Sequence, residues 1–170
     1  MAALYIVASF GCSSEKNPIY KDASADIEVR VNDLLGRMTL EEKILQLNQY
    51  VLGVNTVENN FGEVVKDIPV EIGSLIYFSD HAEGRNAMQK KAMEESRLGI
   101  PIIFGHDVIH GYRTTYPIPL ALACSWNPEL VRQASEVAAQ EAYACGVNWT
   151  FSPMVDVSRD PRWGRVMECF

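Results

Sequence analysis

Short apolar segments alternate with helical patterns over the second half of the chain, and this rhythm restricts the fold more than any other feature. Apolar runs at 73–78, 100–104 and 147–151 are typical of strands, and helices are expected at 82–97 and 127–144. Continuous apolar strands that alternate with helices indicate a parallel sheet covered on both faces. The sequence therefore predicts an α/β fold.

Two α/β architectures accept this pattern, a doubly wound sheet and a (β/α)8 TIM barrel. Doubly wound nucleotide-binding sheets carry a glycine-rich phosphate loop after a strand, and neither GxGxxG nor GxxxxGK occurs in the sequence. A complete barrel needs about 250 residues, whereas this chain has 170 and three predicted strands. We therefore expect an incomplete (β/α)8 TIM barrel, its N-terminal portion only.

Two further helices and a loop are expected before this alternation. Apolar residues recur at helical spacing over 27–38, and TLEE (39–42) has the pattern of a capping box for the helix EEKILQLNQ that follows. The residues of this helix expected to face inward are Ile44, Leu45 and Leu47. Residues 53–69 are rich in Gly, Asn and acidic side chains and are typical of a loop.

Composition narrows the class of protein. Apolar residues make up 48% of the chain and charged residues 22%, which is typical of a globular protein with a real core. The formal net charge of −7 argues against nucleic acid or an anionic membrane surface as the main partner, because both recruit clustered Lys and Arg. No run of about 18 apolar residues occurs, so the sequence predicts no membrane-spanning helix.

The first residues resemble a bacterial lipoprotein signal. Residues 2–11 form a short apolar run that ends in small residues, and Cys12 and the polar tract SSEKN follow. We expect a signal segment over 1–12 and a polar linker over 13–26. Lipidated Cys12 would anchor the protein to a membrane, as a periplasmic or outer-membrane lipoprotein of a Gram-negative bacterium. The alternative is a frayed segment without lipid, because no Lys or Arg precedes the apolar run.

The remaining cysteines and the histidines predict neither a disulfide scaffold nor a metal centre. Three cysteines are left after lipidation and cannot all pair, and Cys124 and Cys145 lie among Ala and Leu, as small core residues do. His106 and His110 flank Asp107 in an HDxxH pattern that lacks the further ligands of a closed zinc site. No cofactor and no metal are expected.

Charged residues follow the predicted strands where a barrel binds its substrate. Asp107 comes three residues after the strand 100–104, and an ionised carboxylate there can accept hydrogen bonds from two adjacent sugar hydroxyls. Arg113 lies six residues further on and could bind a carboxylate or a hydroxyl. The alternatives are a turn cap for Asp107 and a solvated side chain for Arg113. The loops after the strands of a barrel converge on one face, which keeps a binding role open for both.

A second charged cluster follows the third predicted strand. Its signs alternate over ten residues, and its members are Asp156, Arg159, Asp160, Arg162 and Arg165. Such alternation either builds a salt-bridge lattice that shapes a loop or, beside the flat ring of Trp163, supplies a carbohydrate site. Glycosidases employ two carboxylates, so the residues taken alone suggest Asp107 and Asp156 as a candidate catalytic pair.

Several stretches taken together resemble one family. LLGRMTLEEKILQL, IPIIFGHDVIHGYRTTYPIPLALACSWNPELV and FSPMVDVSRDPRWGRVMECF are similar to the N-terminal barrel domain of glycoside hydrolase family 3, in particular its periplasmic β-glucosidases. The likeness covers 27–170 and is collinear. It implies exo-acting, retaining hydrolysis of terminal non-reducing β-D-glucosyl residues through a covalent glycosyl-enzyme, with a β-glucoside or an oligosaccharide as substrate.

The resemblance also assigns roles to the charged residues. It implies that Asp107 and Arg165 bind hydroxyls of the terminal sugar and that Arg113 lines the same site in some members. Glu168 would support a lysine further along the chain. These are substrate-binding and supporting roles, so the resemblance implies no catalytic residue among them.

The catalytic groups are expected elsewhere. Asp156 and Asp160 become loop-shaping residues, which sets the candidate catalytic pair aside. The resemblance implies a nucleophilic Asp in an SDW-like motif and a sugar-binding Lys-His pair downstream of Phe170. The general acid would come later still, usually from a second domain. We therefore expect an N-terminal fragment that lacks the nucleophile and the acid/base and has no turnover alone.

Three alternatives to a β-glucosidase fragment stay open. The parent enzyme could be a β-xylosidase or another exo-glycosidase of the same family, because the groups that reject a hydroxymethyl are not identifiable. The chain could instead be a non-catalytic surface lipoprotein that binds sugars. It could also be an unstable translation product, because an open sheet edge after the third strand would leave backbone groups unpaired.

Overall fold

The computed structural model describes residues 17–52, 68–78 and 82–169. The chain divides into two compact units after Thr39, and each unit is described by itself. The expected signal segment with Cys12 lies outside the described residues, as does most of the expected loop at 53–69. None of the described helices is long and apolar enough to cross a bilayer.

The first unit contains the 3-10 helix η1 (Ile19–Lys21) and the helix α1 (Ile27–Arg37). Asp26 caps α1, because its side chain accepts hydrogen bonds from the backbone N–H groups at the second and third helical positions. These bonds satisfy two of the N–H groups that a helix leaves unpaired at its start. The helix predicted over 27–38 is confirmed.

The expected linker over 13–26 carries more structure than its polar composition indicates. It includes η1, which is tied to α1 by the Asp33 carboxylate; this carboxylate accepts the backbone N–H of Tyr20 at 3.1 Å. Arg30 donates from Nε to the Tyr20 carbonyl, also at 3.1 Å. Both backbone groups of Tyr20 are therefore held by side chains of α1.

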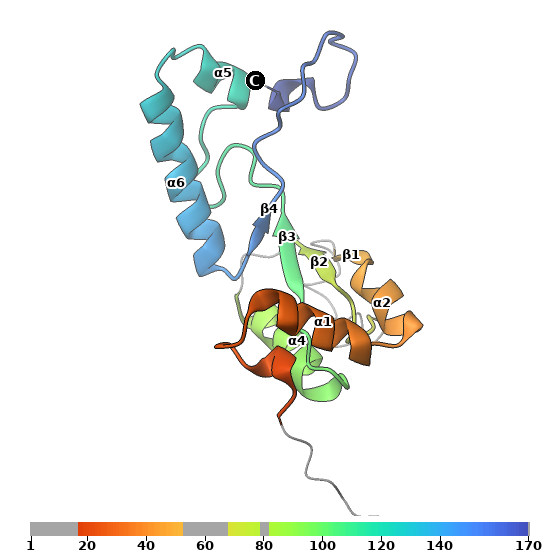
Figure 1. Cartoon of the computed structure of the whole chain (residues 1–170). Helices are drawn as coiled ribbons and strands as arrows, with labels where there is room; N and C mark the ends of the chain where they lie inside the picture. Colours follow the sequence, from red (N-terminus) through yellow and green to blue (C-terminus); the bar gives the residue numbers. More distant parts are fainter. Residues whose placement is uncertain (1–16, 53–67, 79–81, 170) are drawn as a thin grey trace, which may run out of the picture. The chain divides into compact units, whose positions relative to one another are not determined.

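The second unit contains a parallel sheet of four strands in sequence order (Figure 1). The strands are β1 (Gln49–Leu52), β2 (Ser74–Tyr77), β3 (Ile103–His106) and β4 (Trp149–Thr150). Each crossover steps one place in the same direction, which is the order in a barrel wall, whereas a doubly wound sheet reverses its order. The predicted α/β fold is confirmed.

The strands differ from the predictions most at β1 and β3, and β4 covers only two of the residues predicted over 147–151. No strand was predicted at β1. Gln49 was assigned to the preceding helix, but this helix ends at Gln46 and Gln49 pairs with Ser74. β3 begins at Ile103 rather than at 100, and Pro101 explains the delay, since proline has no N–H for the ladder. The sheet thus has one strand more than the three that the sequence predicts.

Two helices of this unit follow the predictions closely, α4 (Ala82–Glu95) and α6 (Pro128–Ala144). Asn127 caps α6 by accepting a backbone N–H of the first turn at 3.2 Å, and proline takes the first helical position, where its missing N–H costs nothing. Gly146 follows α6 with a φ of +88°, a left-handed conformation that glycine adopts without strain. The predicted beginning and end of this helix are confirmed.

The remaining elements are α2 (Leu40–Gln46), α5 (Pro119–Ala123) and the 3-10 helix η3 (Val166–Glu168). α5 lies where the prolines predict a loop, and it forms because Pro119 occupies the first helical position. η3 lies beside α5 (Figure 1). Neither short helix has the apolar periodicity that a sequence pattern detects.

The prediction that α2 turns three apolar residues inward is wrong for two of them. Ile44 is 52% exposed and Leu47 is 88% exposed, whereas Leu45 is half-buried. Neighbouring residues point to different sides of so short a helix, and the side of Leu45 is the one that is covered. Leu47 follows the last residue of α2 and lies in the turn that leads to β1.

The expected core role of the two cysteines holds for one of them. Cys145 is buried, as predicted, whereas Cys124 is exposed. Cys124 follows the last residue of α5, a helix that buries Pro119 and Leu122 instead. Surrounding Ala and Leu therefore did not identify which side of α5 is covered.

Two clusters of buried residues hold the second unit together. The first core cluster packs the sheet against α4 and comprises Leu52, Ile72, Leu75, Tyr77, Met88, Ala92, Ile102 and Phe104. The second core cluster lies between α6 and the segments next to β3 and β4; it comprises Val108, Ala138, Ala142 and Val147, with Tyr112 packed against it. Alanine at every fourth position of one face of α6 lets this helix approach closely.

Candidate substrate-binding site

Asp107 and the segment after β4 leave the sheet at the same edge. His106 at the end of β3 lies opposite Thr150 at the end of β4. The N–H of Phe151 continues this ladder by donating to the His106 carbonyl at 3.2 Å. The carboxyl ends of the two strands are therefore neighbours, as expected for the loops of a barrel.

Because Gly105 has no side chain, the segment that follows β4 can place an aromatic ring, that of Phe151, against β3. A Cβ at this position would lie 2.6 Å from Cζ of Phe151, well inside van der Waals contact. The Phe151 ring packs edge-on against Trp149, with ring centroids 4.9 Å apart. The Phe151 ring thus occupies the space that a side chain at position 105 would need.

Asp107, Arg165 and Glu168 form one charged group at this edge of the sheet, although the first two are 58 residues apart in sequence. Nη2 of Arg165 lies 3.5 Å from Oδ1 of Asp107. Oε2 of Glu168 accepts from Nε of Arg165 at 2.7 Å and lies 2.6 Å from Nη2. Glu168 therefore holds the guanidinium tightly, whereas Asp107 makes a longer contact and remains partly exposed.

The electrostatics of this group follow from the same contacts. The hydrogen bond that Arg165 donates to Glu168 raises the pKa of Arg165 above its usual value, and the charges of Glu168 and Asp107 add to the increase against a smaller loss from burial. Arginine is a cation at every pH of interest. The edge thus presents a fixed guanidinium donor beside carboxylate acceptors, the combination that a polyhydroxylated ligand requires.

Packing fixes the backbone on both sides of Asp107. The His106 ring meets the rings of Phe78 and Tyr112 edge-on, with centroid distances of 5.3 Å in each case. Val108, the next residue, is 7% exposed and belongs to the second core cluster. Asp107 therefore projects from a backbone that is anchored in the core.

The two histidines of the HDxxH segment lie in different surroundings. His106 packs among aromatic rings, and His110 is exposed, with its carbonyl accepting the N–H of Tyr116 at 2.7 Å. In the part of the chain that the structure describes, no three His, Cys, Asp or Glu side chains converge on a position that could hold a metal ion.

The backbone of Arg113 is clamped to α6. Glu141 accepts the N–H groups of Arg113 and Thr114, both at 2.8 Å, and the Thr114 hydroxyl at 2.6 Å. The hydrogen bonds of Thr114 are the main cause of a lowered pKa of Glu141, and the Arg113 charge contributes. The charge of Arg113 therefore acts on Glu141, whereas Asp107 faces Arg165.

The second charged cluster is organised by a local pair. Asp160 accepts the backbone N–H of Arg162 at 2.9 Å and its guanidinium at 2.5 Å, and these bonds lower the pKa of Asp160. The two residues are two positions apart, so their pairing shapes a turn. This agrees with the loop-shaping role that the resemblance gives to Asp160.

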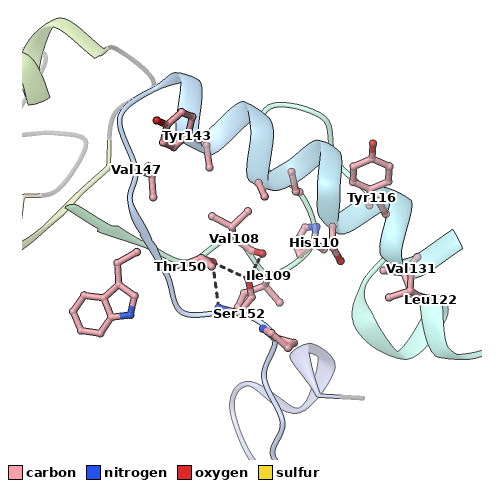
Figure 2. A pocket seen from close by; sticks show the side chains of 18 of the residues that line it. Val108, Ile109, His110, Tyr116, Leu122, Val131, Tyr143, Val147, Thr150 and Ser152 are labelled. Carbon is pink, nitrogen blue, oxygen red and sulfur yellow. Dashed lines mark hydrogen bonds between the residues drawn. The ribbon is translucent and has the colours of Figure 1, made fainter. Parts of the chain in front are cut away.

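A cavity of about 600 Å³ lies between α6 and the segments next to β3 and β4 (Figure 2). Val108 and Val147 contribute to its wall, and the hydroxyls of Thr150 and Ser152 are 2.9 Å apart. The Ser152 hydroxyl also donates to the Val108 carbonyl at 2.5 Å. The lining residues, all within the described ranges, include no Asp, Glu, Lys or Arg. We therefore place the candidate sugar site at the Asp107 edge and not in this cavity.

Comparison with known proteins decides the family. The family described as "Glycosyl hydrolase family 3 N terminal domain" matches residues 39–170. The chain belongs to glycosyl hydrolase family 3. This family-3 chain is 45% identical over 140 residues to the periplasmic β-glucosidase of Salmonella typhimurium, covering 82% of the chain and 18% of the relative. It is 33% identical over 167 residues to a putative β-xylosidase of Formosa agariphila, covering 89% of the chain and 22% of the relative.

Solved structures agree with the sequence relatives. The crystal structure of a mutant β-glucosidase from Listeria innocua in complex with laminaribiose matches the family-3 chain with a TM-score of 0.73 and 43% identity. The match covers 85% of this chain and 21% of the Listeria protein, so the chain spans about a fifth of the length of such relatives. The family predicted from the sequence is confirmed.

Two contacts of the site carry little sequence signal. Arg165 and Glu168 are three positions apart, a spacing that pairs side chains on a helical turn. Their contact could have been predicted only if the short helix η3 had been predicted first. The clamp of Glu141 on Arg113 and Thr114 joins positions 27 and 28 residues apart. No pattern in the sequence connects those positions.

Proposed function

We propose that this chain forms part of the glucose-binding wall of an exo-acting, retaining β-glucosidase of glycosyl hydrolase family 3. Asp107 and Arg165 would hold the terminal non-reducing sugar. The observation that carries the proposal is the convergence of these two side chains, at 3.5 Å, beyond the neighbouring ends of β3 and β4. The names of relatives in two bacteria, both β-glucosidases, support the same substrate class.

The chemistry of the two side chains suits a pyranose rim. The Asp107 carboxylate can accept hydrogen bonds from two adjacent hydroxyls, and its side chain is 38% exposed, so its oxygens are open to a ligand. Arg165 can donate to a sugar oxygen through the guanidinium N–H groups that do not bond to Glu168. Glu168 keeps the guanidinium in place through Nε and Nη2. In our proposal Glu168 therefore positions Arg165, in addition to any downstream lysine.

We propose a narrower role for Arg113. Its backbone is fixed by Glu141 on α6, so the loop after β3 is held while the guanidinium, which is exposed, remains available. A long side chain from a fixed loop can contact the part of a substrate beyond the terminal sugar. Arg113 would then line the site as the resemblance implies, without contributing to the Asp107–Arg165 pair.

In a retaining mechanism one carboxylate attacks the anomeric carbon and another protonates the leaving oxygen, then activates water. We propose that neither group lies within residues 1–170. In support, the two carboxylates at the candidate site among the described residues, Asp107 and Glu168, both contact Arg165. Purified residues 13–170 should therefore not hydrolyse an aryl β-glucoside. Measurable turnover by this chain, lost in an Asp107→Ala variant, would overturn this part of the proposal.

Calorimetric titration of the 170-residue chain with glucose and gluconolactone tests sugar binding directly. We expect Asp107→Ala to weaken binding by at least about tenfold, because the charged hydrogen bonds to two hydroxyls are lost. Asp156→Ala is the matched control, since Asp156 is an exposed carboxylate on the segment after β4. Equal losses in both variants, or binding that Asp107→Ala leaves intact, would remove Asp107 from the site.

A β-xylosidase is the second candidate, because relatives named β-xylosidase also match the chain. Xylose lacks the hydroxymethyl group of glucose. Parallel titrations with glucose and xylose distinguish the two candidates. Tighter binding of xylose would favour the β-xylosidase alternative and contradict the β-glucosidase proposal.

We also propose that the protein is exported to the periplasm and anchored through a lipid on Cys12. The support is the apolar run at 2–11 and the periplasmic β-glucosidase among the relatives. Metabolic labelling with a radioactive fatty acid should mark the wild-type protein and leave Cys12→Ser unlabelled. An anchored protein that binds sugar without turnover in its full-length form would instead support a non-catalytic surface lipoprotein.

A further inference from the structure

The guanidinium of Arg85, on α4, lies inside the protein between the two core clusters. Arg85 is only 2% exposed. Nη2 donates to the Tyr77 carbonyl in the first core cluster, and Nη1 donates to the Cys145 carbonyl, both at 2.9 Å. Cys145 lies two residues before Val147 of the second core cluster. Arg85 therefore joins the end of β2 to the turn before β4.

The surroundings of Arg85 satisfy its two terminal nitrogens, whereas its buried Nε has no hydrogen-bond partner among the described residues. The guanidinium carbon lies 5.1 Å from the centroid of the Tyr77 ring, a cation–π distance. A Cβ at Gly146 would lie 3.3 Å from Cδ of Arg85, so the glycine that ends α6 also leaves room for the arginine stem. Both hydrogen-bond acceptors are neutral carbonyls. A buried guanidinium without an acceptor charge is costly, and an apolar side chain would fill the space at less cost.

Tyr112 connects this buried cation to the candidate site. Its ring packs against the second core cluster, which includes Val108, and meets the His106 ring edge-on at 5.3 Å. Burial raises the pKa of Tyr112, and the charge and hydrogen bond of Arg85 oppose that increase. Asp107 lies between His106 and Val108 in the chain. Tyr112 therefore contacts His106, which precedes Asp107, and packs against the core cluster that contains Val108, which follows Asp107.

We propose that Arg85 and Tyr112 are positioning residues for Asp107. Arg85 fixes the distance between the end of β2 and the turn before β4, because the planar guanidinium spans both carbonyls in a rigid fork. Tyr112, whose ring meets the His106 ring and packs against the cluster that contains Val108, then fixes the His106–Asp107–Val108 backbone. The role in sugar binding rests on the function proposed above, whereas the placement of Asp107 is a structural statement that can be tested alone.

The first test uses Tyr112→Phe, which removes one hydroxyl and keeps the ring contacts. Two readouts are needed at a temperature well below the melting temperature: the backbone amide resonance of Asp107 and the affinity for gluconolactone. We expect the Asp107 resonance to shift and the affinity to fall roughly three- to tenfold, as for the loss of a buried hydrogen bond. The control is Tyr143→Phe, on α6 and 78% exposed, which should change neither readout.

The second test uses Arg85→Lys, which keeps the charge and loses the fork. A single ammonium cannot reach both carbonyls as the guanidinium does, so we expect the Asp107 resonance to shift at least as far as in Tyr112→Phe. A role confined to stability would lower the melting temperatures and leave resonance and affinity unchanged. That outcome, or equal shifts in Tyr143→Phe, would overturn the proposal.

The two proposals fail in different ways. If the wild-type chain binds no sugar while the Asp107 resonance shifts in both variants, sugar binding by this chain is wrong and the positioning role stands. If the wild type binds gluconolactone through Asp107 and neither variant moves the resonance or the affinity, the positioning role is wrong and the binding role stands.

Discussion

The loop after β3 and the segment after β4 meet at the same edge of the sheet, but different kinds of contact hold them. The loop after β3 is fixed from a distance: Val108 is 7% exposed, and Glu141 binds the loop backbone from α6. The segment after β4 exposes Val155 by 82% and Val157 by 80%. Its turn at 160–162 is made by a pair two residues apart.

This difference separates the two halves of the candidate site. Asp107 derives its position from the protein core, whereas the guanidinium of Arg165 is held mainly by Glu168, three residues away. A sugar that bridges Asp107 and Arg165 would therefore join a fixed acceptor to a donor that has mostly local support. The predictions below test whether long-range contacts matter on one side of the site and local contacts on the other.

The largest effect is expected where the two strand ends touch, at Gly105. A Cβ there would lie 2.6 Å from the Phe151 ring, so Gly105→Val must displace this ring from its packing against Trp149. We expect a loss of at least about 3 kcal/mol in the free energy of unfolding, at the upper end for overpacking. Urea denaturation followed by fluorescence measures it.

Gly36→Ala is the control for this substitution. Gly36 lies in α1, and a Cβ there would meet nothing within 4 Å. Alanine should stabilise that helix by about 0.5–1 kcal/mol. A Gly105→Val protein as stable as the wild type would show that the Phe151 ring does not occupy the space beside Gly105.

The next effect comes from one substitution made on both sides of the site. Val108→Thr places a hydroxyl in the second core cluster, where we expect a loss of about 1–2 kcal/mol. Val155→Thr places the same hydroxyl in solvent and should cost almost nothing. The same urea titrations measure both. Equal losses would mean that the segment after β4 is as buried as the loop after β3.

Sequence patterns predicted the scaffold well because the scaffold is periodic. The helix at 127–144 has a cap and a stop signal that follow from local chemistry, and Asn127, Pro128 and Gly146 act as predicted. β1 was missed because QYVL is short and has three exposed residues, so its apolar pattern is weak. Pro119 predicted a loop but begins α5, since proline is compatible with a first helical turn.

The site was predicted less completely, because its contacts are not periodic. Asp107 and Arg165 were named through the family resemblance, and no spacing rule brings residues 58 positions apart to 3.5 Å. Arg85 gave no signal, since an arginine within a charged helix is typical of a solvated face. Its burial depends on two carbonyls, at Tyr77 and Cys145, that only the fold places together.

A moderate effect is expected from the clamp on the loop after β3. Glu141→Gln removes the charge that binds the N–H groups of Arg113 and Thr114. Hydrogen exchange of these two amides should become several-fold faster, because their acceptor is weakened. Glu136→Gln is the matched control, since Glu136 lies on α6 and pairs with the exposed Arg132. Unchanged exchange in Glu141→Gln would contradict the clamp.

The clamp also predicts a pH dependence with a definite sign. Its hydrogen bonds lower the pKa of Glu141 below the usual 4.5, so the folded state favours the charged form more than the unfolded state does. The stabilisation is therefore fully present above pH 4.5 and is lost as the pH falls through the lowered pKa. Exchange at Arg113 and Thr114, corrected for the intrinsic rate, should accelerate in that acid range in the wild type. Glu141→Gln should show no such acceleration.

The smallest effect is expected from the local pair on the segment after β4. Asp160 and Arg162 are both exposed, and solvent screens their attraction, so Asp160→Asn should shift the melting temperature by no more than about 1 °C. The amide resonance of Asp107 should not move, because the pair shapes its own turn and not the loop after β3. Glu168→Gln gives the internal comparison, since its partner Arg165 contacts Asp107. A shift of the Asp107 resonance in Asp160→Asn as large as that in Glu168→Gln would show that the two segments are coupled along their whole length, and local support could no longer explain the position of Arg165.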